Sequence, residues 1–190
     1  MRILLPAQEA QLLSVIRPGE PFGRRDCALI RLAVHTGLRS AELCGLNVGD
    51  VVTVGGCARQ WVDVVGKGGH SRQVPLNSAA RQAVVDLVAF NRARGFSVAE
   101  AAPLLVTRCH KRLPTRSLRD IIQKYRERAD LDVKCSPHTF RHTFASRLAG
   151  CASLPVVQAT LGHKKLSSTQ VYSHVTPAQL VEGVERLVDG

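Results

Sequence analysis

Apolar residues along most of the chain recur at intervals of three and four positions, the spacing that places them on one face of an α-helix. Gly37 can end one such helix in a left-handed turn, and Ser136 followed by Pro137 can begin another. The predicted helices cover residues 8–16, 24–35, 40–45, 78–92, a basic segment around 118–125, 138–149, 154–161 and 177–188. The pattern therefore predicts a mainly helical protein.

The pattern changes between residues 48 and 76, where short runs of β-branched residues replace the helical spacing. These runs cover residues 51–54, 61–65 and 73–76, and glycine-rich turns separate them. Such an arrangement predicts a three-stranded antiparallel meander. The expected fold class is thus mainly α with a small three-stranded antiparallel β-sheet on one edge, an α+β domain.

The charge balance suggests a polyanionic partner. The 190 residues include 26 Lys and Arg against 15 Asp and Glu, a net charge of +11. Aromatic residues make up only 4%, which disfavours base stacking on single strands and favours duplex DNA. No apolar run reaches the length of about 18 residues that a membrane helix needs, so we expect a cytoplasmic, nucleoid-associated protein. A basic protein that is merely soluble is the alternative.

The densest cationic stretch runs from Arg108 to Arg128, where an apolar face of Leu118, Ile122 and Tyr125 leaves the cations on the outside. A surface that faces DNA is favoured over an ordinary solvated helix face, because eight cations meet only two acids there. Tyr125 is predicted to be a packing residue.

Metal and disulfide chemistry find little support. The six cysteines are scattered without a regular spacing, so we expect mostly reduced, small core residues. His138 and His142 have the i, i+4 spacing of a zinc pair, but Thr139 stands where a metalloprotease needs glutamate, and no third ligand is evident. We therefore predict no metal and no cofactor.

The last quarter of the chain carries a nucleophile together with cationic groups. Phosphodiester exchange without a metal needs a nucleophile, cations around the nonbridging oxygens and an acid for the leaving oxygen. Tyr172 can attack, while His138 and Arg141, three apart on a helix, share a face. Arg39 lies in a short link between helices, and Lys67 lies at a glycine-flanked hairpin tip.

Four segments together resemble the successive sequence boxes of the tyrosine recombinase (phage integrase) family. They are TGLRSAEL at 36–43, GKG at 66–68, HTFRH at 138–142, and the stretch from LGH at 161–163 to Tyr172. The segments occur in the family's order and with its spacings across nearly the whole chain. The family's catalytic-domain fold is therefore expected.

The resemblance also implies roles for individual residues. The residues that would bind and stabilise the scissile phosphate are Arg39, His138, Arg141 and His163. Lys67 would protonate the leaving 5′ oxygen, and Tyr172 would attack to form a 3′-phosphotyrosyl bond that conserves the energy needed for rejoining. Glu42 matches a position that supports the active site, and His142 is expected to pack or hydrogen-bond nearby.

A single catalytic domain over residues 1–190 is expected, without the N-terminal DNA-clamping domain that family members usually carry. The expected partners are double-stranded DNA and other recombinase protomers in a DNA-bound synaptic tetramer. The predicted DNA-binding residues are Lys111, Arg112, Arg116, Arg119, Lys164 and Lys165. The apolar stripe of residues 177–188 is expected to contact a neighbouring protomer, although it can also fold back on its own domain.

Two other functions fit parts of this pattern. A noncatalytic DNA-binding protein could share the fold, but the six intact candidate catalytic positions argue against it. A type IB topoisomerase shares the chemistry, but such an enzyme is normally longer and relaxes DNA without a partner site.

Overall fold

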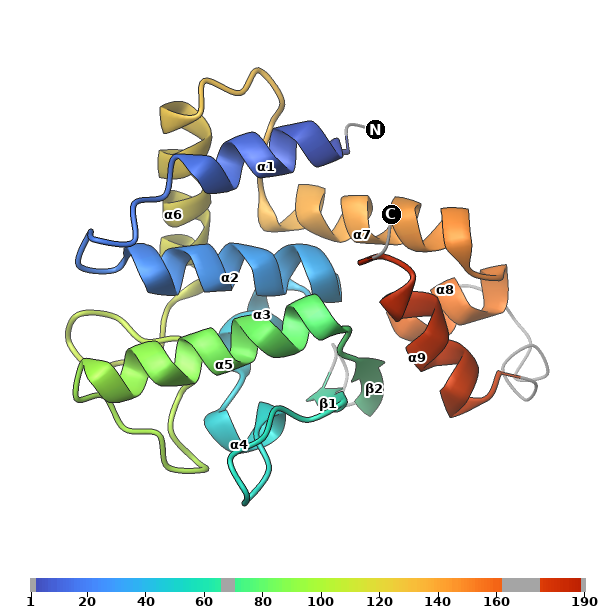
Figure 1. Ribbon diagram of the computed structural model, residues 1–190, viewed down its shortest axis with the longest axis horizontal. Helices are drawn as coiled ribbons and strands as arrows, with labels where there is room; N and C mark the ends of the chain where they lie inside the picture. Colours follow the sequence, from blue (N-terminus) through green and yellow to red (C-terminus); the bar gives the residue numbers. More distant parts are fainter. Residues whose placement is uncertain (1–2, 66–70, 162–174, 189–190) are drawn as a thin grey trace.

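The structure, a computed structural model, describes residues 3–65, 71–161 and 175–188 and is mainly helical (Figure 1). Its elements, in chain order, are α1 (Pro6–Ser14), α2 (Gly23–Thr36), α3 (Ser40–Gly45), α4 (Val48–Val51), β1 (Trp61–Val65), β2 (Ser71–Pro75), α5 (Ser78–Ala93), α6 (Thr115–Arg128), α7 (Pro137–Cys151), α8 (Leu154–Leu161) and α9 (Pro177–Glu185). The helices predicted from the apolar spacing are thereby confirmed, with ends that differ by a few residues.

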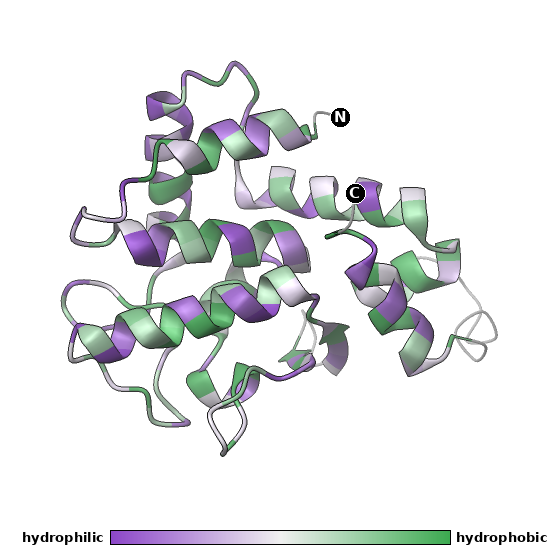
Figure 2. Ribbon diagram, in the orientation of Figure 1, coloured by the Kyte–Doolittle hydropathy of each residue, from purple (hydrophilic) through white to green (hydrophobic). Residues whose placement is uncertain are grey.

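Helix α2 forms the centre of the main core. It packs against α5 and α7, whereas α1 packs against α6. Leu29, Ile30 and Leu32 of α2 are completely buried. Each such side chain contributes roughly 1.5–3 kcal/mol through the removal of apolar surface from water. Figure 2 shows the expected alternation of hydrophobic and hydrophilic residues along α5 and α6.

The last helix, α9, packs within its own chain. Val184 is completely buried in a second core cluster with Phe144, Leu148 and Leu161, which come from α7 and α8. Glu185 also accepts a hydrogen bond from the backbone N–H of Ser78 at 2.9 Å, which ties α9 to the start of α5. In this structure the segment therefore folds back on its own domain.

The prediction of a three-stranded sheet was wrong, because the described residues form a sheet of two strands, β1 and β2. They pair in an antiparallel register that places Val62 opposite Val74, and residues 51–54 contribute only an isolated bridge between Val52 and Ala58. Residues 48–51, which reach into the expected first strand, form the helical turn α4 instead. The Asp50 carboxylate accepts a hydrogen bond from the backbone N–H of Asn47 at 2.7 Å and stabilises that turn. Val54 is 99% exposed, so no packing against a sheet compensates for strand formation there.

Gly37 ends α2 as predicted, in a left-handed turn with φ of +58°. The position requires glycine for a second reason, since a Cβ there would lie 2.5 Å from the ring of Phe144. The Ser136 side chain caps α7 by accepting a hydrogen bond from the backbone N–H of Thr139 at 3.1 Å. Both signals fix helix ends close to candidate catalytic residues, because Arg39 follows α2 and α7 carries His138 and Arg141.

None of the helices within residues 3–65, 71–161 and 175–188 is long and apolar enough to cross a membrane. All six cysteines lie in these ranges and form no disulfide. Only Cys44 and Cys135 are buried, whereas Cys57 and Cys109 are exposed, so the expectation of core cysteines holds for a minority.

We expect the free energy of unfolding to fall as the pH drops from about 7 to 5, because of His35 on α2. The His35 ring lies 3.3 Å from the Asn77 amide nitrogen through Nδ1 and 3.7 Å from the Glu9 carboxylate through Nε2. Burial lowers the pKa of His35, and the charges of Arg147 and Arg31 add to this effect while Glu9 opposes it.

Since the unfolded chain binds a proton near pH 6.5 more readily than the folded protein does, stability is complete above that pH and is lost below it. One such proton changes the free energy by at most about 1.4 kcal/mol per pH unit. Urea unfolding of wild type and His35→Gln between pH 5 and 8 measures the slope, which should be shallower in the variant. The pKa of His142 is lowered too, so His142 also contributes to the pH dependence. The slope of His142→Gln, measured in the same way, gives the size of that contribution. Equal slopes in wild type and His35→Gln would contradict this assignment.

Candidate active site

The turn between α2 and α3 presents Arg39 to solvent. Gly37 reverses the chain, Leu38 anchors the turn in the core, and Arg39 occupies the residue before α3 in an extended conformation. The Arg39 side chain is 45% exposed. The predicted position of Arg39 in a short link between two helices is therefore confirmed.

Glu42, in the first turn of α3, is the anionic centre of the site. Its carboxylate accepts hydrogen bonds from the backbone N–H of Arg39 at 2.8 Å and from the Arg39 guanidinium at 2.9 Å. It also accepts two hydrogen bonds from Arg72 of β2, at 2.7 and 2.9 Å. Burial alone would raise the pKa of Glu42, but the hydrogen bonds from Arg72 and Arg39 outweigh it and lower the pKa to about 2. The carboxylate therefore stays ionised and holds both guanidinium groups.

Arg141 of α7 is buried, with 8% of its surface exposed, and links two elements. Its guanidinium donates to the carbonyl oxygen of Gly37 at 2.6 Å and to that of Leu161, the last residue of α8, at 2.5 Å. Burial, followed by the charges of Arg39 and Arg72, lowers the pKa of Arg141 to about 10. Arg141 therefore remains charged at neutral pH, next to two other cations, which is the electrostatic environment of an anion site.

His138 and His142 contact each other on α7. Their Nε2 atoms lie 2.7 Å apart and their rings pack edge to face with centroids 4.1 Å apart, so one ring donates a hydrogen bond to the other. Burial, then the charges of His138 and Arg141, lowers the pKa of His142. The direct neighbour of His138 is thus His142, and the expectation that His142 hydrogen-bonds nearby is confirmed. Within the described residues, this pair belongs to no cluster of three or more His, Cys, Asp or Glu side chains that could hold a metal.

Five predicted site residues lie outside the described residues, namely Lys67, His163, Lys164, Lys165 and Tyr172. Their assignments stay predictions from the sequence. The described flanks do lead toward the site, because β2 follows the segment with Lys67 and carries Arg72. Likewise, Leu161 precedes the segment with His163 and Tyr172, and its carbonyl is held by Arg141.

Arg72 is the member of the site that sequence reasoning missed. It lies directly before the run of residues 73–76, whose β-branched residues predict a strand. The available signal was a cation in a strand that closely follows the glycine-flanked Lys67, but its partner Glu42 lies 30 positions away. Only the fold brings the two together.

The predicted DNA-binding cations differ in how they are used. Lys111, Arg116 and Arg119 are exposed, and within the described residues no hydrogen bond or ion pair of their side chains is found. The Arg112 guanidinium instead donates to the carbonyl oxygens of three residues at the end of α3 and beyond, with a shortest distance of 2.6 Å to Gly45. Arg112 therefore caps α3, and a DNA contact by this residue stays a prediction.

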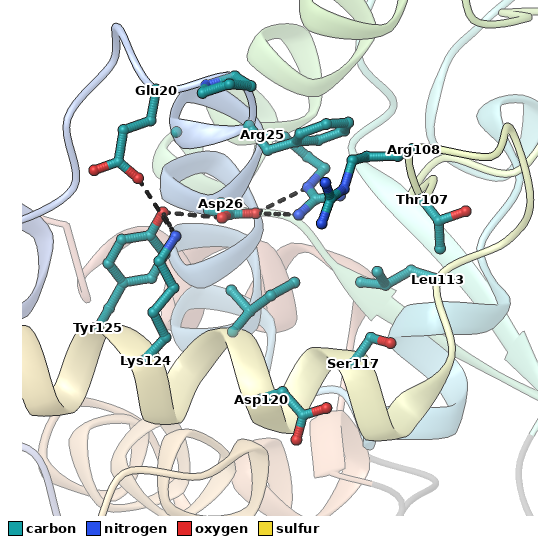
Figure 3. A pocket seen from close by; sticks show the side chains of 14 residues that line it. Glu20, Arg25, Asp26, Thr107, Arg108, Leu113, Ser117, Asp120, Lys124 and Tyr125 are labelled. Atoms are coloured by element: carbon teal, nitrogen blue, oxygen red, sulfur yellow. Dashed lines mark hydrogen bonds and ion pairs between the residues drawn. The ribbon is translucent and has the colours of Figure 1, made fainter.

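The other half of α6 is engaged within the fold. Lys124 and Arg128 pair with Glu20 at 3.4 and 2.6 Å. Tyr125 is completely buried and donates a hydrogen bond from its hydroxyl to Asp26 at 2.9 Å, so the packing role predicted for it is confirmed. Figure 3 shows Tyr125 and Asp26 pointing toward each other beside an open pocket of about 470 Å³, in which Arg25 pairs with the same carboxylate.

Comparisons with known proteins find relatives that match most of the chain. The chain matches the profile of the phage integrase family over residues 2–179. It is 38% identical over 184 residues to the tyrosine recombinase XerC of Pelotomaculum thermopropionicum, a match that covers 94% of this chain and 59% of the relative. It is 39% identical over 164 residues to the tyrosine recombinase XerD of Corynebacterium glutamicum, covering 85% of this chain and 52% of the relative.

A solved structure, the integrase from mycobacterium phage Brujita, is similar with a TM-score of 0.70 and 25% identity over 98% of this chain and 58% of that one. This chain thus spans between half and three fifths of the length of these three proteins.

Proposed function

We propose that this chain, which belongs to the phage integrase family, is the catalytic domain of a site-specific tyrosine recombinase that cleaves and rejoins DNA strands through a 3′-phosphotyrosyl intermediate. The observation that carries the proposal is the gathering of Arg39, Arg72 and Arg141 around the single carboxylate of Glu42. This arrangement leaves excess positive charge where two of the family's segments, residues 36–43 and 138–142, contact each other. The XerC and XerD relatives are named tyrosine recombinases.

Arg39 and Arg141 would act on the scissile phosphate. Arg39 is exposed, and among the described residues its guanidinium donates one hydrogen bond, to Glu42, so we expect its other donors to meet nonbridging oxygens. Arg141 contributes a fixed charge from a buried position in α7. His138 lies on the exposed side of the same helix. Charges held in place before the reaction stabilise the developing negative charge without a reorganisation cost.

Tyr172 and Lys67 would perform the bond exchange, with His163 as a further phosphate ligand. The Tyr172 hydroxyl loses its proton to solvent as its oxygen forms a bond to phosphorus. The bond from phosphorus to the 5′ oxygen breaks at the same time, and the Lys67 ammonium gives a proton to that leaving oxygen. The energy of the phosphodiester is kept in the phosphotyrosyl bond, so rejoining follows by the reverse exchange with a new 5′ hydroxyl.

Duplex DNA and further protomers, in a synaptic tetramer, are the proposed partners. The net charge of +11 and the exposed cations at the start of α6 favour binding to the phosphate backbone. Because recombination joins two duplexes, protomers bound to separate half-sites would have to assemble on the DNA.

Replacing Arg116 and Arg119 with glutamine should weaken duplex binding at every salt concentration. Each lost phosphate contact lowers the slope of log affinity against log salt by about 0.9. Titration of one labelled duplex at several salt concentrations measures this slope for the wild type and for the variant. The matched control is Arg128→Gln, also on α6, whose guanidinium pairs with Glu20 within the fold. A slope that changes equally in the control would contradict a DNA-facing role of the start of α6.

The direct test of the proposed function is capture of the covalent intermediate. The target site is not specified by the side chains, so the chain is incubated, in excess EDTA, with a pool of nicked duplexes that carry randomised flanks. A nick close to the cleaved bond releases a short fragment and traps the adduct, which denaturing gels separate and sequencing identifies. An adduct attached to Tyr172 supports the proposal. Duplex binding without any adduct would favour a noncatalytic DNA-binding protein, and relaxation of supercoiled plasmid without strand exchange would favour a topoisomerase.

A further inference from the structure

Arg72 occupies an unusual place for an arginine in a two-stranded sheet. It lies on β2 opposite Val64, and its side chain is only 14% exposed. A guanidinium that is this far removed from water needs partners for its charge and its N–H groups. Its partners come from two other elements.

The contacts of Arg72 join three parts of the chain. Its two terminal nitrogens donate to the two oxygens of Glu42 at 2.7 and 2.9 Å, the paired geometry in which an arginine fork matches a carboxylate. Its Nε donates over a longer distance, 3.5 Å, to the carbonyl oxygen of Thr160 near the end of α8. Arg72 therefore connects β2 with the first turn of α3 and with the end of α8.

Arg39 and Arg72 share Glu42 but face different surroundings. The Arg39 side chain is 45% exposed, whereas those of Arg72 and Glu42 are 14% and 3% exposed. With both arginines present, the three side chains carry one net positive charge. Without Arg72, the buried Glu42 would neutralise Arg39 and leave no net charge at the exposed guanidinium.

We propose that Arg72 is a positioning residue of the strand-cleavage reaction: by neutralising and fixing Glu42, it leaves the charge of Arg39 available for the scissile phosphate. This inference rests on the proposed function, because it concerns the same site. Arg72 acts through Glu42 and makes no contact with DNA.

The test combines single and double substitutions. Arg72→Gln should slow single-turnover formation of the Tyr172 adduct by about 100-fold, the usual effect of losing one charge-stabilising group. Adding Glu42→Gln removes the anion that had captured Arg39, so the double variant should react faster than Arg72→Gln by on the order of tenfold. Arg72→Lys keeps the charge but loses the paired geometry, so we expect a rate between those of wild type and Arg72→Gln.

The control is another ion pair of similar burial. Arg147 pairs with Glu9 at 2.6 Å, with side chains 23% and 12% exposed, between α7 and α1. Arg147→Gln should lower the midpoint of thermal unfolding while it leaves the rate of adduct formation unchanged. Duplex affinity is measured in parallel for every variant and should change little.

The outcomes distinguish a failure of the proposed function from a failure of the role proposed for Arg72. No adduct from the wild-type chain overturns the proposed function and this inference with it. Suppose that the wild type forms the adduct but the double variant reacts more slowly than Arg72→Gln. Arg72 then contacts DNA directly or only stabilises the fold, and this inference is overturned while the proposed function stands. If Arg72→Gln does not fold, the comparison moves to Arg72→Lys, and a wild-type rate in that variant likewise overturns it.

Discussion

A Tyr172→Phe variant should bind duplex DNA with wild-type affinity and form no covalent adduct. The substitution removes one oxygen, the atom that must bond to phosphorus, and leaves an aromatic ring of nearly the same shape. Because a nucleophile has no partial substitute, the expected loss is complete rather than graded. Adduct formation is measured on the nicked duplex selected from the randomised pool, and affinity is measured on the same duplex without the nick.

Tyr125 provides the matched control, since the chain has two tyrosines. Burial, followed by the nearby Asp26 carboxylate, raises the pKa of Tyr125, and its hydroxyl donates to that carboxylate. Such a phenol is locked into the fold and is not available as a nucleophile. Tyr125→Phe should cost about 1–3 kcal/mol of stability, because it leaves a buried acceptor without one hydrogen bond, and should keep the adduct. An adduct that survives in Tyr172→Phe and disappears in Tyr125→Phe would reverse the assignment.

The amino-acid pattern predicts the elements that depend on neighbouring residues. Gly37, Ser136 and the apolar spacing of α2 act locally, so the pattern alone places the helices that flank Arg39 and carry Arg141. The failed strand at residues 51–54 had a local cause as well, namely the Asp50 side chain at the start of α4. The hydrogen bond from Asn47 to Asp50 favours a helical turn, whereas the β-branched residues favour a strand over the same backbone. Strand propensity alone does not include the energy of that hydrogen bond.

The contacts that give each cation its role span longer distances in the sequence. Arg112 looked like a DNA-binding residue, yet its guanidinium reaches carbonyl oxygens 66 to 68 positions away. Arg72 went unnoticed because the carboxylate that it neutralises lies on another element. Composition gives the number of cations, but only the packing of α3, β2 and α8 determines which of them are neutralised and which stay available to a phosphate.

Arg141→Lys should slow adduct formation by about 100-fold or more while the chain still folds. The loss of one preorganised charge-stabilising group costs about 3 kcal/mol in the transition state. A lysine keeps the charge, but its single ammonium does not reproduce the two hydrogen bonds, at 2.6 and 2.5 Å, with which Arg141 joins Gly37 to Leu161. Each lost hydrogen bond from a charged group is worth about 1.5–3 kcal/mol, so stability should fall as well.

The two consequences of Arg141→Lys are separated by a variant that affects stability alone. Leu148 lies on the same helix and is completely buried in the cluster with Val184. Leu148→Ala should lower the free energy of unfolding by about 2–5 kcal/mol through the cavity that it leaves. Below the unfolding midpoints of both variants, Leu148→Ala should form the adduct at the wild-type rate per folded molecule, whereas Arg141→Lys should not. Equal rates in the two variants would mean that Arg141 serves the fold and that another cation stabilises the reacting phosphate.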